Sequence, residues 1–260
     1  MACGVRAVSK RKYGEADVAA YANGADLGKQ AAKDLTAILK RAIKEQGEAA
    51  IIVATGNSQL QFIKALRETP GIAWDRVRVF HMDEYVGMSD THSASFRKYI
   101  RENLTDIVRP LAFYGVQGDA PDLEAELQRY TELLARYKPV AVVMGIGENG
   151  HLAFNDPPAD FTTDKSIHIV TLDAKCRQQQ VGEGHFPNLE AVPTHALSLT
   201  ISELIKPAHL LVVVPEERKA VAVKAALEGP VTETCPASIL QQQPHARVYL
   251  DRESSSLLSV

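Results

Sequence analysis

The chain has 260 residues, of which 45% are hydrophobic and 23% charged, so it is long enough to bury a substantial core. A formal net charge of -3 provides no overall positive field for nucleic acid or for an anionic membrane surface. No stretch reaches the roughly 20 apolar residues of a membrane-spanning helix, and the first residues lack the apolar core of a signal peptide. We therefore expect a soluble, cytoplasmic protein, folded as a single domain over residues 1–260, with neither nucleic acid nor membrane as a partner.

Short runs of β-branched and other apolar residues alternate with stretches of helical periodicity. Strands are predicted at residues 49–54, 77–81, 139–145, 167–172 and 210–214. Helices are predicted near residues 59–67, 93–103, 123–137 and 216–227, and the region before residue 49 reads as one amphipathic helix. Near-continuous apolar strands are typical of a sheet that is covered on both faces. The pattern predicts an α/β fold with an open, mostly parallel sheet and helices on both faces.

Polar, charged or glycine-bearing loops follow several of these strands. They span residues 55–58, 82–85, 147–151 and 215–219. In an open α/β sheet, ligands bind outside the carboxyl ends of the strands. We therefore expect these loops to converge on one rim and to form the functional site there.

The first loop, Thr55-Gly56-Asn57-Ser58, joins an apolar strand to a helix. Backbone N–H groups at a helix start can bind an anion such as a phosphate. The alternative is an ordinary turn in which Ser58 caps the helix. A Walker loop is excluded because no Gly-Lys-Ser/Thr follows.

Gly145, Gly147 and Gly150 form a G-x-G-x-x-G pattern directly after a predicted strand. A dinucleotide site would require a helix that opens at the third glycine, but Pro157-Pro158 would break such a helix within two turns. The glycines are better explained as a sharp turn that lets the backbone approach a ligand. We therefore expect no bound cofactor.

His151, with Asn149 and Asp156 nearby, forms a candidate unit for proton transfer. An imidazole exchanges protons near neutral pH, and a hydrogen-bonding partner is needed to set its tautomer. A solvated loop histidine is the alternative. The spacing from His151 to Asp156 suits no common metal-ligand pattern and the other histidines are scattered, so we predict no metal site.

Asp83-Glu84 directly follows a predicted strand, so at least one carboxylate should lie at the rim of the sheet. A partly desolvated carboxylate there has a raised pKa and can act as a general base. The alternative is a solvated pair, or a helix cap at Asp83. Lys219, with Arg218 before it, stands at a predicted helix start, where cations are not favoured, and this indicates that one of them faces an anion.

Taken in order, three motifs resemble the glucosamine-6-phosphate deaminase/isomerase family over about residues 55–250. They are Met82-Asp-Glu-Tyr-Val-Gly87, Gly145-Ile-Gly-Glu-Asn-Gly-His-Leu-Ala-Phe-Asn-Asp-Pro157 and Arg218-Lys-Ala-Val-Ala222. The resemblance implies a Rossmann-like fold and a cofactor-free conversion of glucosamine 6-phosphate to fructose 6-phosphate and ammonia. The related 6-phosphogluconolactonases usually continue the second motif differently, so Phe154-Asn-Asp-Pro157 fits the deaminases better.

The resemblance also implies roles for individual residues. Asp83 would move a proton from C2 to C1 of the open-chain sugar, and His151 would open the sugar ring. Asp156 and Asn149 would orient that histidine. The expected substrate-binding residues are Thr55, Gly56, Asn57, Ser58, Glu84, Gly150, Arg177 and Lys219.

Departures from the family pattern concern Asn149, Asp156 and the phosphate site. Asn149 stands where some members have aspartate, and Asp156 is often a glutamate. Thr55-Gly-Asn-Ser replaces a commoner Thr-Gly-Gly-Thr/Ser loop. Gln180 occupies the position expected to hold a phosphate-binding arginine, and Arg177, one turn away on the same helical face, is the candidate substitute.

Other interpretations remain open at this stage. One is a hydrolase of a sugar-phosphate lactone, in which His151 activates water and Asp83 is dispensable. Others are a deaminase/isomerase specific for galactosamine 6-phosphate and a sugar-phosphate sensor without catalysis. The partner in each case is a small sugar phosphate, and a homo-oligomer is a further option.

Overall fold

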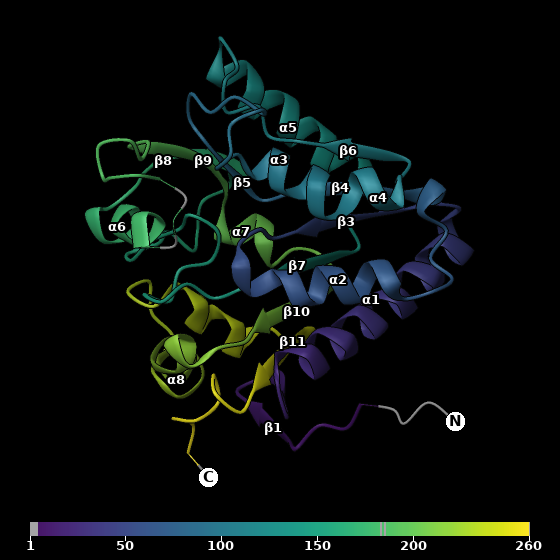
Figure 1. The fold of residues 1–260 in the computed structure, drawn as a ribbon. Helices are drawn as coiled ribbons and strands as arrows, with labels where there is room; N and C mark the ends of the chain where they lie inside the picture. The colour runs from purple at the N-terminus through teal and green to yellow at the C-terminus, as the bar shows by residue number, and fades with distance from the viewer. Residues whose placement is uncertain (1–4, 183, 185, 260) are drawn as a thin grey trace.

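The computed structural model describes residues 5–182, 184 and 186–259, without the side chains of residues 175, 176 and 179. At its centre is an eight-stranded sheet (Figure 1). The strands lie in the spatial order β1 (Ser9–Tyr13), β2 (Ala16–Tyr21), β11 (Ala246–Asp251), β10 (His209–Val214), β7 (Ala141–Met144), β3 (Ala49–Val53), β4 (Val77–His81) and β6 (Ala112–Tyr114). All neighbours are parallel except β1 and β2, which form an antiparallel hairpin at one edge.

Helices cover both faces of this sheet, as predicted. One core packs the sheet against α1 (Gly24–Gln46), α2 (Leu60–Glu68) and the π-helical turn η3 (Arg101–Thr105), which continues α3 (Phe96–Ile100). The other packs it against α5 (Leu123–Tyr137), α7 (Ile201–Leu204) and α8 (Ala220–Glu228). Successive side chains of a strand point to opposite faces, so Ile51 joins the first core and Ile52 the second. This two-sided burial explains why all of β3 is apolar.

The predicted helices are found, and side chains cap the starts of α3 and α5 but not those of α2 and α8. α5 begins after Asp122, whose Oδ1 accepts a hydrogen bond from Ala125 N at 3.1 Å. Short helical turns complete the connections: η1 (Asn57–Gln59), η2 (Trp74–Arg76), α4 (Asp106–Val108), η4 (Glu217–Lys219) and η5 (Pro236–Gln242).

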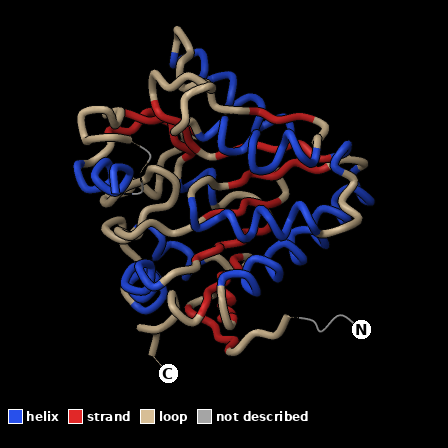
Figure 2. Tube along the Cα trace, viewed as in Figure 1, coloured by secondary structure: helices blue, strands red, loops and turns tan. Residues whose placement is uncertain are grey.

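A second, three-stranded antiparallel sheet stands beside the main one, in the order β5 (Asp83–Tyr85), β9 (His195–Leu199) and β8 (Ile167–Thr171) (Figure 2). The strand predicted at residues 167–172 exists, but it belongs to this small sheet. Ile167 is buried, and the following residues alternate between half-buried and exposed because only one face is covered. That face packs with α6 (Ala174–Gly182) through a third core that includes Tyr85 and Phe154.

The N-terminal region holds more than the single predicted helix, because the hairpin β1–β2 precedes α1. The edge strand β1 carries Lys10, Arg11 and Lys12 and so lacks the apolar pattern that identifies a strand. The serine-rich tail at residues 254–256 is held to the body of the protein. Ser254 is fully buried, and its backbone N–H donates to Asp251 Oδ1 at 2.8 Å.

Neither a membrane span nor a disulfide is found within the described part of the chain. None of its helices is long and apolar enough to cross a membrane. Cys235 carries a free thiol. From the sequence we expect Cys3, Cys176 and Cys235 all to be free thiols, because they form no C-x-x-C pair; Cys3 and the side chain of Cys176 lie outside the described residues.

Gly118 lets the segment before α5 pass close to β5. Its carbonyl accepts from Gly87 N at 2.7 Å, and a Cβ at Gly118 would overlap the carbonyl oxygen of Tyr85. We expect Gly118→Ala to lower the free energy of unfolding by about 1–3 kcal/mol, as measured by urea denaturation. The control is Gly182→Ala, where a Cβ meets nothing within 4 Å. Equal stability of the two variants would contradict this packing.

Candidate active site

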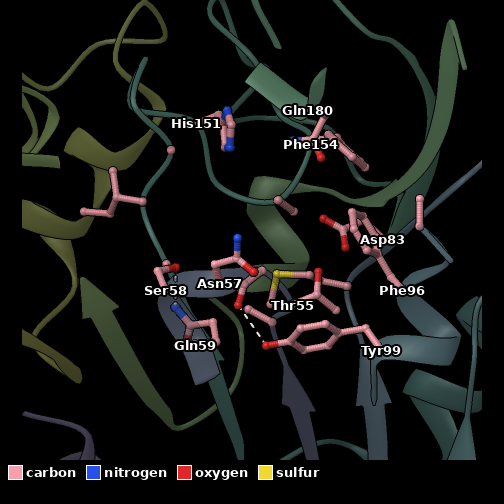
Figure 3. Close-up of a pocket in the computed structure, with 18 of the residues that line it drawn as sticks. Thr55, Asn57, Ser58, Gln59, Asp83, Phe96, Tyr99, His151, Phe154 and Gln180 are labelled. Atoms are coloured by element: carbon pink, nitrogen blue, oxygen red, sulfur yellow. Dashed lines mark hydrogen bonds between the residues drawn. The ribbon is translucent and has the colours of Figure 1, made fainter. Parts of the chain in front are cut away.

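The four predicted loops converge on one cavity at the carboxyl ends of β3, β4, β7 and β10 (Figure 3). Asp83 and Phe96 lie on one side of it, Ser58 and Gln59 on the opposite side, and His151 above. Its lining comprises residues 54–59, 82–83, 93–96, 99, 145–147, 151, 153–154, 180 and 218–219. Backbone groups, ionisable side chains and aromatic rings from both sheets therefore face a common space.

Asp83 brings a desolvated carboxylate to this cavity. Its residue is only 6% exposed, and Oδ1 has no hydrogen-bond partner among the described residues. Burial, and next the neighbouring charge of Glu84, raise the pKa of Asp83 to about 8. The predicted rise in pKa is thus found, and the helix-cap alternative is wrong because Asp83 lies in β5. A carboxylate of this kind can accept a proton from a bound ligand.

Glu84, predicted to bind substrate, does not line the cavity. Its carboxylate accepts hydrogen bonds from Ser95 Oγ at 2.7 Å and from Arg97 N at 3.0 Å. Because adjacent strand residues point to opposite sides, Glu84 turns away from the cavity when Asp83 faces it. It therefore holds the start of α3, which contributes Phe96 and Tyr99 to the cavity wall.

His151 is oriented by Asp156 and Asn149, as predicted. His151 Nδ1 lies 3.1 Å from Asp156 Oδ1, and Asn149 Nδ2 donates to the same oxygen at 2.9 Å. Asn149 Oδ1 in turn accepts from His151 N at 3.1 Å. With Nδ1–H donating to the carboxylate, Nε2 is the ring nitrogen that can accept a proton. Asn149 and Asp156 do not line the cavity themselves, so they act on a ligand only through His151.

Gly147 provides the space in which this imidazole lies. A Cβ at Gly147 would overlap Nε2, Cδ2 and Cε1 of His151. The ring therefore packs against the glycine backbone, and any larger residue would displace it. No helix begins at Gly150, so the dinucleotide interpretation fails on the structure as well as on the sequence.

Asn155, for which we predicted no role from the sequence, holds the loop that carries His151. Its side chain is buried, and Nδ2 donates to Leu152 O and Leu199 O, both at 2.8 Å. The bond to Leu199 ties the His151 loop to β9, which also pairs with β5 at Asp83. The small sheet thus fixes His151 and Asp83 relative to each other.

The loop at residues 55–58 faces the cavity and opens a helix. Gly56 has φ +98°, a value that favours glycine, and Tyr99 Oη donates to Gly56 O at 2.8 Å. Gln59 N donates to Gly56 O and Leu60 N to Asn57 O, so the N–H groups without a partner inside the helix are those at the very start of η1, on Asn57 and Ser58. They can therefore receive an anion, as predicted, whereas Ser58 makes no capping bond.

The turn after β10 has the same shape as the turn after β3. Glu216 has φ +83° and ψ +139°, close to the +98° and +161° of Gly56. Glu216 N donates to Asp251 Oδ2 at 3.1 Å, which secures this conformation. Lys219, at the start of the helix that follows, is only 5% exposed and lines the cavity. Two helix starts and a buried lysine thus face one space, which favours an anionic ligand.

Arg177 and Gly150, both predicted to bind substrate, do not line the cavity. The Nη2 group of Arg177 donates to Leu189 O at 2.7 Å and to Val192 O at 2.9 Å, so it supports the loop after α6. Gln180, one helical turn on, reaches the cavity instead. Gly150 has φ +86°, and its carbonyl accepts from Ala237 N at 2.8 Å, which is a structural role in the loop.

Several lining residues carry no signal in the sequence. Phe96 and Tyr99 lie on a predicted helix, but periodicity alone does not say which face meets a ligand. Phe154 stands inside the motif that contains His151, and its ring packs against Tyr85 at 5.3 Å between centroids. Together they form the apolar side of the cavity near Asp83. Within the described residues, no group of three or more His, Cys, Asp or Glu side chains is placed to hold a metal ion.

The chain is similar in sequence to proteins of one known family. Residues 22–250 match the family described as glucosamine-6-phosphate isomerases/6-phosphogluconolactonase. A glucosamine-6-phosphate deaminase from Bacillus cytotoxicus is 35% identical over 222 residues, covering 85% of this chain and 83% of the relative. Another, from Exiguobacterium sibiricum, is 36% identical over 223 residues, covering 85% and 86%.

Solved structures show the same likeness. A monomeric glucosamine-6-phosphate deaminase is 29% identical with a TM-score of 0.84, over 92% of this chain and 99% of that chain. A 6-phosphogluconolactonase from Shewanella baltica OS155 has a TM-score of 0.74 at 19% identity, over 90% of this chain and 97% of that chain. The second likeness is one of fold alone.

The buried carboxyl of Asp83 makes stability depend on pH. Its pKa of about 8 in the folded protein lies above the ordinary aspartate value of 3.8, so folding takes up a proton between these pH values and stability falls as pH rises. Asn does not titrate. We therefore expect the melting temperature of Asp83→Asn to exceed that of the parent by an amount that grows from about pH 5 to about pH 8. Asp75→Asn, at an exposed carboxylate, is the matched control. A difference that does not vary with pH would contradict the buried carboxyl.

Proposed function

The chain belongs to the family of glucosamine-6-phosphate isomerases and 6-phosphogluconolactonases, and within it we propose a glucosamine-6-phosphate deaminase. The reaction is glucosamine 6-phosphate plus water to fructose 6-phosphate plus ammonia. The observation that carries the proposal is Asp83: a buried carboxylate of raised pKa that faces the same cavity as His151 and the anion-binding loop. An isomerisation needs such a base, whereas hydrolysis of a lactone does not.

Ring opening is assigned to His151. Its Nε2 would take the proton of the anomeric hydroxyl and return it to the ring oxygen, which breaks the C1–O5 bond and leaves an open-chain aldehyde. The Asp156 carboxylate on Nδ1 stabilises the imidazolium that forms between these two transfers. Asn149 holds Asp156 in place by its 2.9 Å bond.

Isomerisation is assigned to Asp83. The C1 aldehyde makes the C2 proton acidic, so the carboxylate can remove it and form an enolamine. Return of the proton to C1 gives an imine at C2. Water then adds to C2 and ammonia leaves, which produces the ketose. The apolar wall of Phe96 and Phe154 keeps the carboxylate poorly solvated and so keeps it basic.

The phosphate would be held at the opposite side of the cavity, by the loop from Thr55 to Ser58 and by Lys219. Backbone N–H groups at two helix starts and a buried ammonium suit a phosphate ester. The phosphate anchors the sugar for both proton transfers, because it lies at the far end from C1 and C2. These groups supply the positioned bases and the anchor that the reaction needs, and the scheme uses no cofactor.

A direct assay tests the reaction. The purified protein should release equal amounts of ammonia and fructose 6-phosphate from glucosamine 6-phosphate, and Asp83→Asn should lower kcat by about a hundredfold or more. Galactosamine 6-phosphate and 6-phosphogluconolactone, supplied separately, test the two alternative substrates. Ammonia from neither amino sugar would overturn the proposal. Lactone hydrolysis that survives Asp83→Asn would favour the lactonase.

The pH dependence follows from the state of Asp83. The base acts only when it has lost its proton, and its pKa is about 8 in the empty site. We therefore expect log(kcat/KM) to rise with a slope of about one below pH 8 and to level off above it. A profile that is flat from about pH 6 to about pH 9 would contradict a role for this carboxylate as the base.

A further inference from the structure

Arg218 stands at the mouth of the cavity between two carboxylates. Its Nη1 donates to Glu148 Oε1 at 2.8 Å, and its Nε donates to Glu216 Oε2 at 2.5 Å. Glu148 belongs to the loop that carries His151, whereas Glu216 belongs to the turn before α8. The guanidinium therefore bridges the two loops that face a bound sugar phosphate at its two ends.

The charge of Arg218 matters because few cations line this cavity. Among the described lining residues, Arg218 and Lys219 are the only arginine and lysine. Gln180 contributes a neutral amide, and Arg177 is held at backbone carbonyls away from the cavity. A phosphate ester carries up to two negative charges, so one lysine and backbone N–H groups leave room for a second cation.

The two ion pairs of Arg218 are of a kind that a ligand can displace. The side chains of Arg218, Glu148 and Glu216 are 33%, 40% and 39% exposed, so water weakens both pairs. A phosphate offers a planar guanidinium more negative charge than a carboxylate does, together with paired oxygens. Exchange of one carboxylate for phosphate is therefore favourable.

We propose that Arg218 is a phosphate-binding residue, and that its guanidinium leaves Glu148 for the substrate phosphate while Glu216 keeps hold of its Nε. Glu148 then acts as a competing anion that occupies Arg218 in the empty site. The inference rests on the proposed function only in taking the ligand to be a phosphate ester. Its signature is that substitution of Arg218 weakens phosphate binding, whereas substitution of its ion-pair partner Glu148 strengthens it.

The test is binding of inorganic phosphate to the whole protein, measured by isothermal titration calorimetry. Arg218→Gln should weaken binding by about ten- to hundredfold, because a charge-assisted hydrogen bond is lost. Glu148→Gln should tighten binding by about two- to fivefold, because a weak competing ion pair is removed. Glu217→Gln is the matched control: it removes one exposed carboxylate from the turn next to Arg218, and it should change affinity less than Glu148→Gln does.

A purely structural ion pair predicts a different pattern. If Arg218 only joined the two loops, both partner variants would weaken phosphate binding together or leave it unchanged, and either result would overturn the proposal. Arg218→Lys keeps the charge without the planar fork and should bind with intermediate affinity; affinity no better than that of Arg218→Gln would also count against it. Calorimetry needs no turnover, so the phosphate site can be tested apart from the reaction. If the protein released no ammonia but Arg218→Gln weakened and Glu148→Gln tightened phosphate binding, the deaminase proposal would be rejected and the phosphate site retained.

Discussion

Burial of the Asp83 carboxyl is the constraint from which the rest of the site follows. A carboxyl without a hydrogen-bond partner for Oδ1 is unfavourable inside a protein, and the raised pKa measures that penalty. Two sheets hold it there. β4 brings the chain to the rim, and β5 pairs Asp83 with Ser198 of β9, which fixes the face of the small sheet on which the Asp83 side chain lies. The fold thus sustains an unfavourable group where it makes a useful base.

Alternation along β5 gives the two adjacent carboxylates different tasks. Glu84 points away from the cavity, where donors from the start of α3 satisfy it, and its charge adds to the pKa shift of Asp83. With the surroundings of Glu84, an aspartate would have its oxygens occupied by hydrogen bonds from the start of α3. The order Asp-Glu therefore matters, and an acidic pair in reverse order would place the longer side chain against the ligand.

The surroundings of His151 act in the opposite way to those of Asp83. Asp83 is made basic by the lack of partners, whereas His151 is oriented by a complete set of them, through Asp156 and Asn149. Gly147 provides the space for its ring, and Asn155 secures its loop. Groups with such different surroundings can serve the two proton transfers of one reaction without exchanging roles.

The sequence predicted those parts that depend on local patterns. Apolar runs located β3, β4, β7 and β10 because both of their faces are buried, and the loops after them met at one rim because parallel strands end together. The interior strand β11 and the edge strand β6 were not predicted; β11 reads Ala-Arg-Val-Tyr-Leu-Asp, without a continuous apolar run. The hairpin β1–β2 was not predicted, because its edge strand β1 is charged. β8 was assigned to the wrong sheet, because a short apolar run does not reveal which strands it pairs with. Glu84 and Arg177 were expected in the cavity, but the direction of a side chain depends on tertiary packing. Phe96 and Tyr99 were missed for the same reason.

The most direct test of this account is the titration of the Asp83 carboxyl itself. Carbon-13 NMR of protein labelled at the aspartate side-chain carboxyl, with Asp83→Asn used to assign the resonance, reports its protonation without a substrate. The account predicts a midpoint at about pH 8 in the empty site. A midpoint near pH 4, the ordinary value for a solvated aspartate, would contradict the claim that burial makes this carboxylate the base.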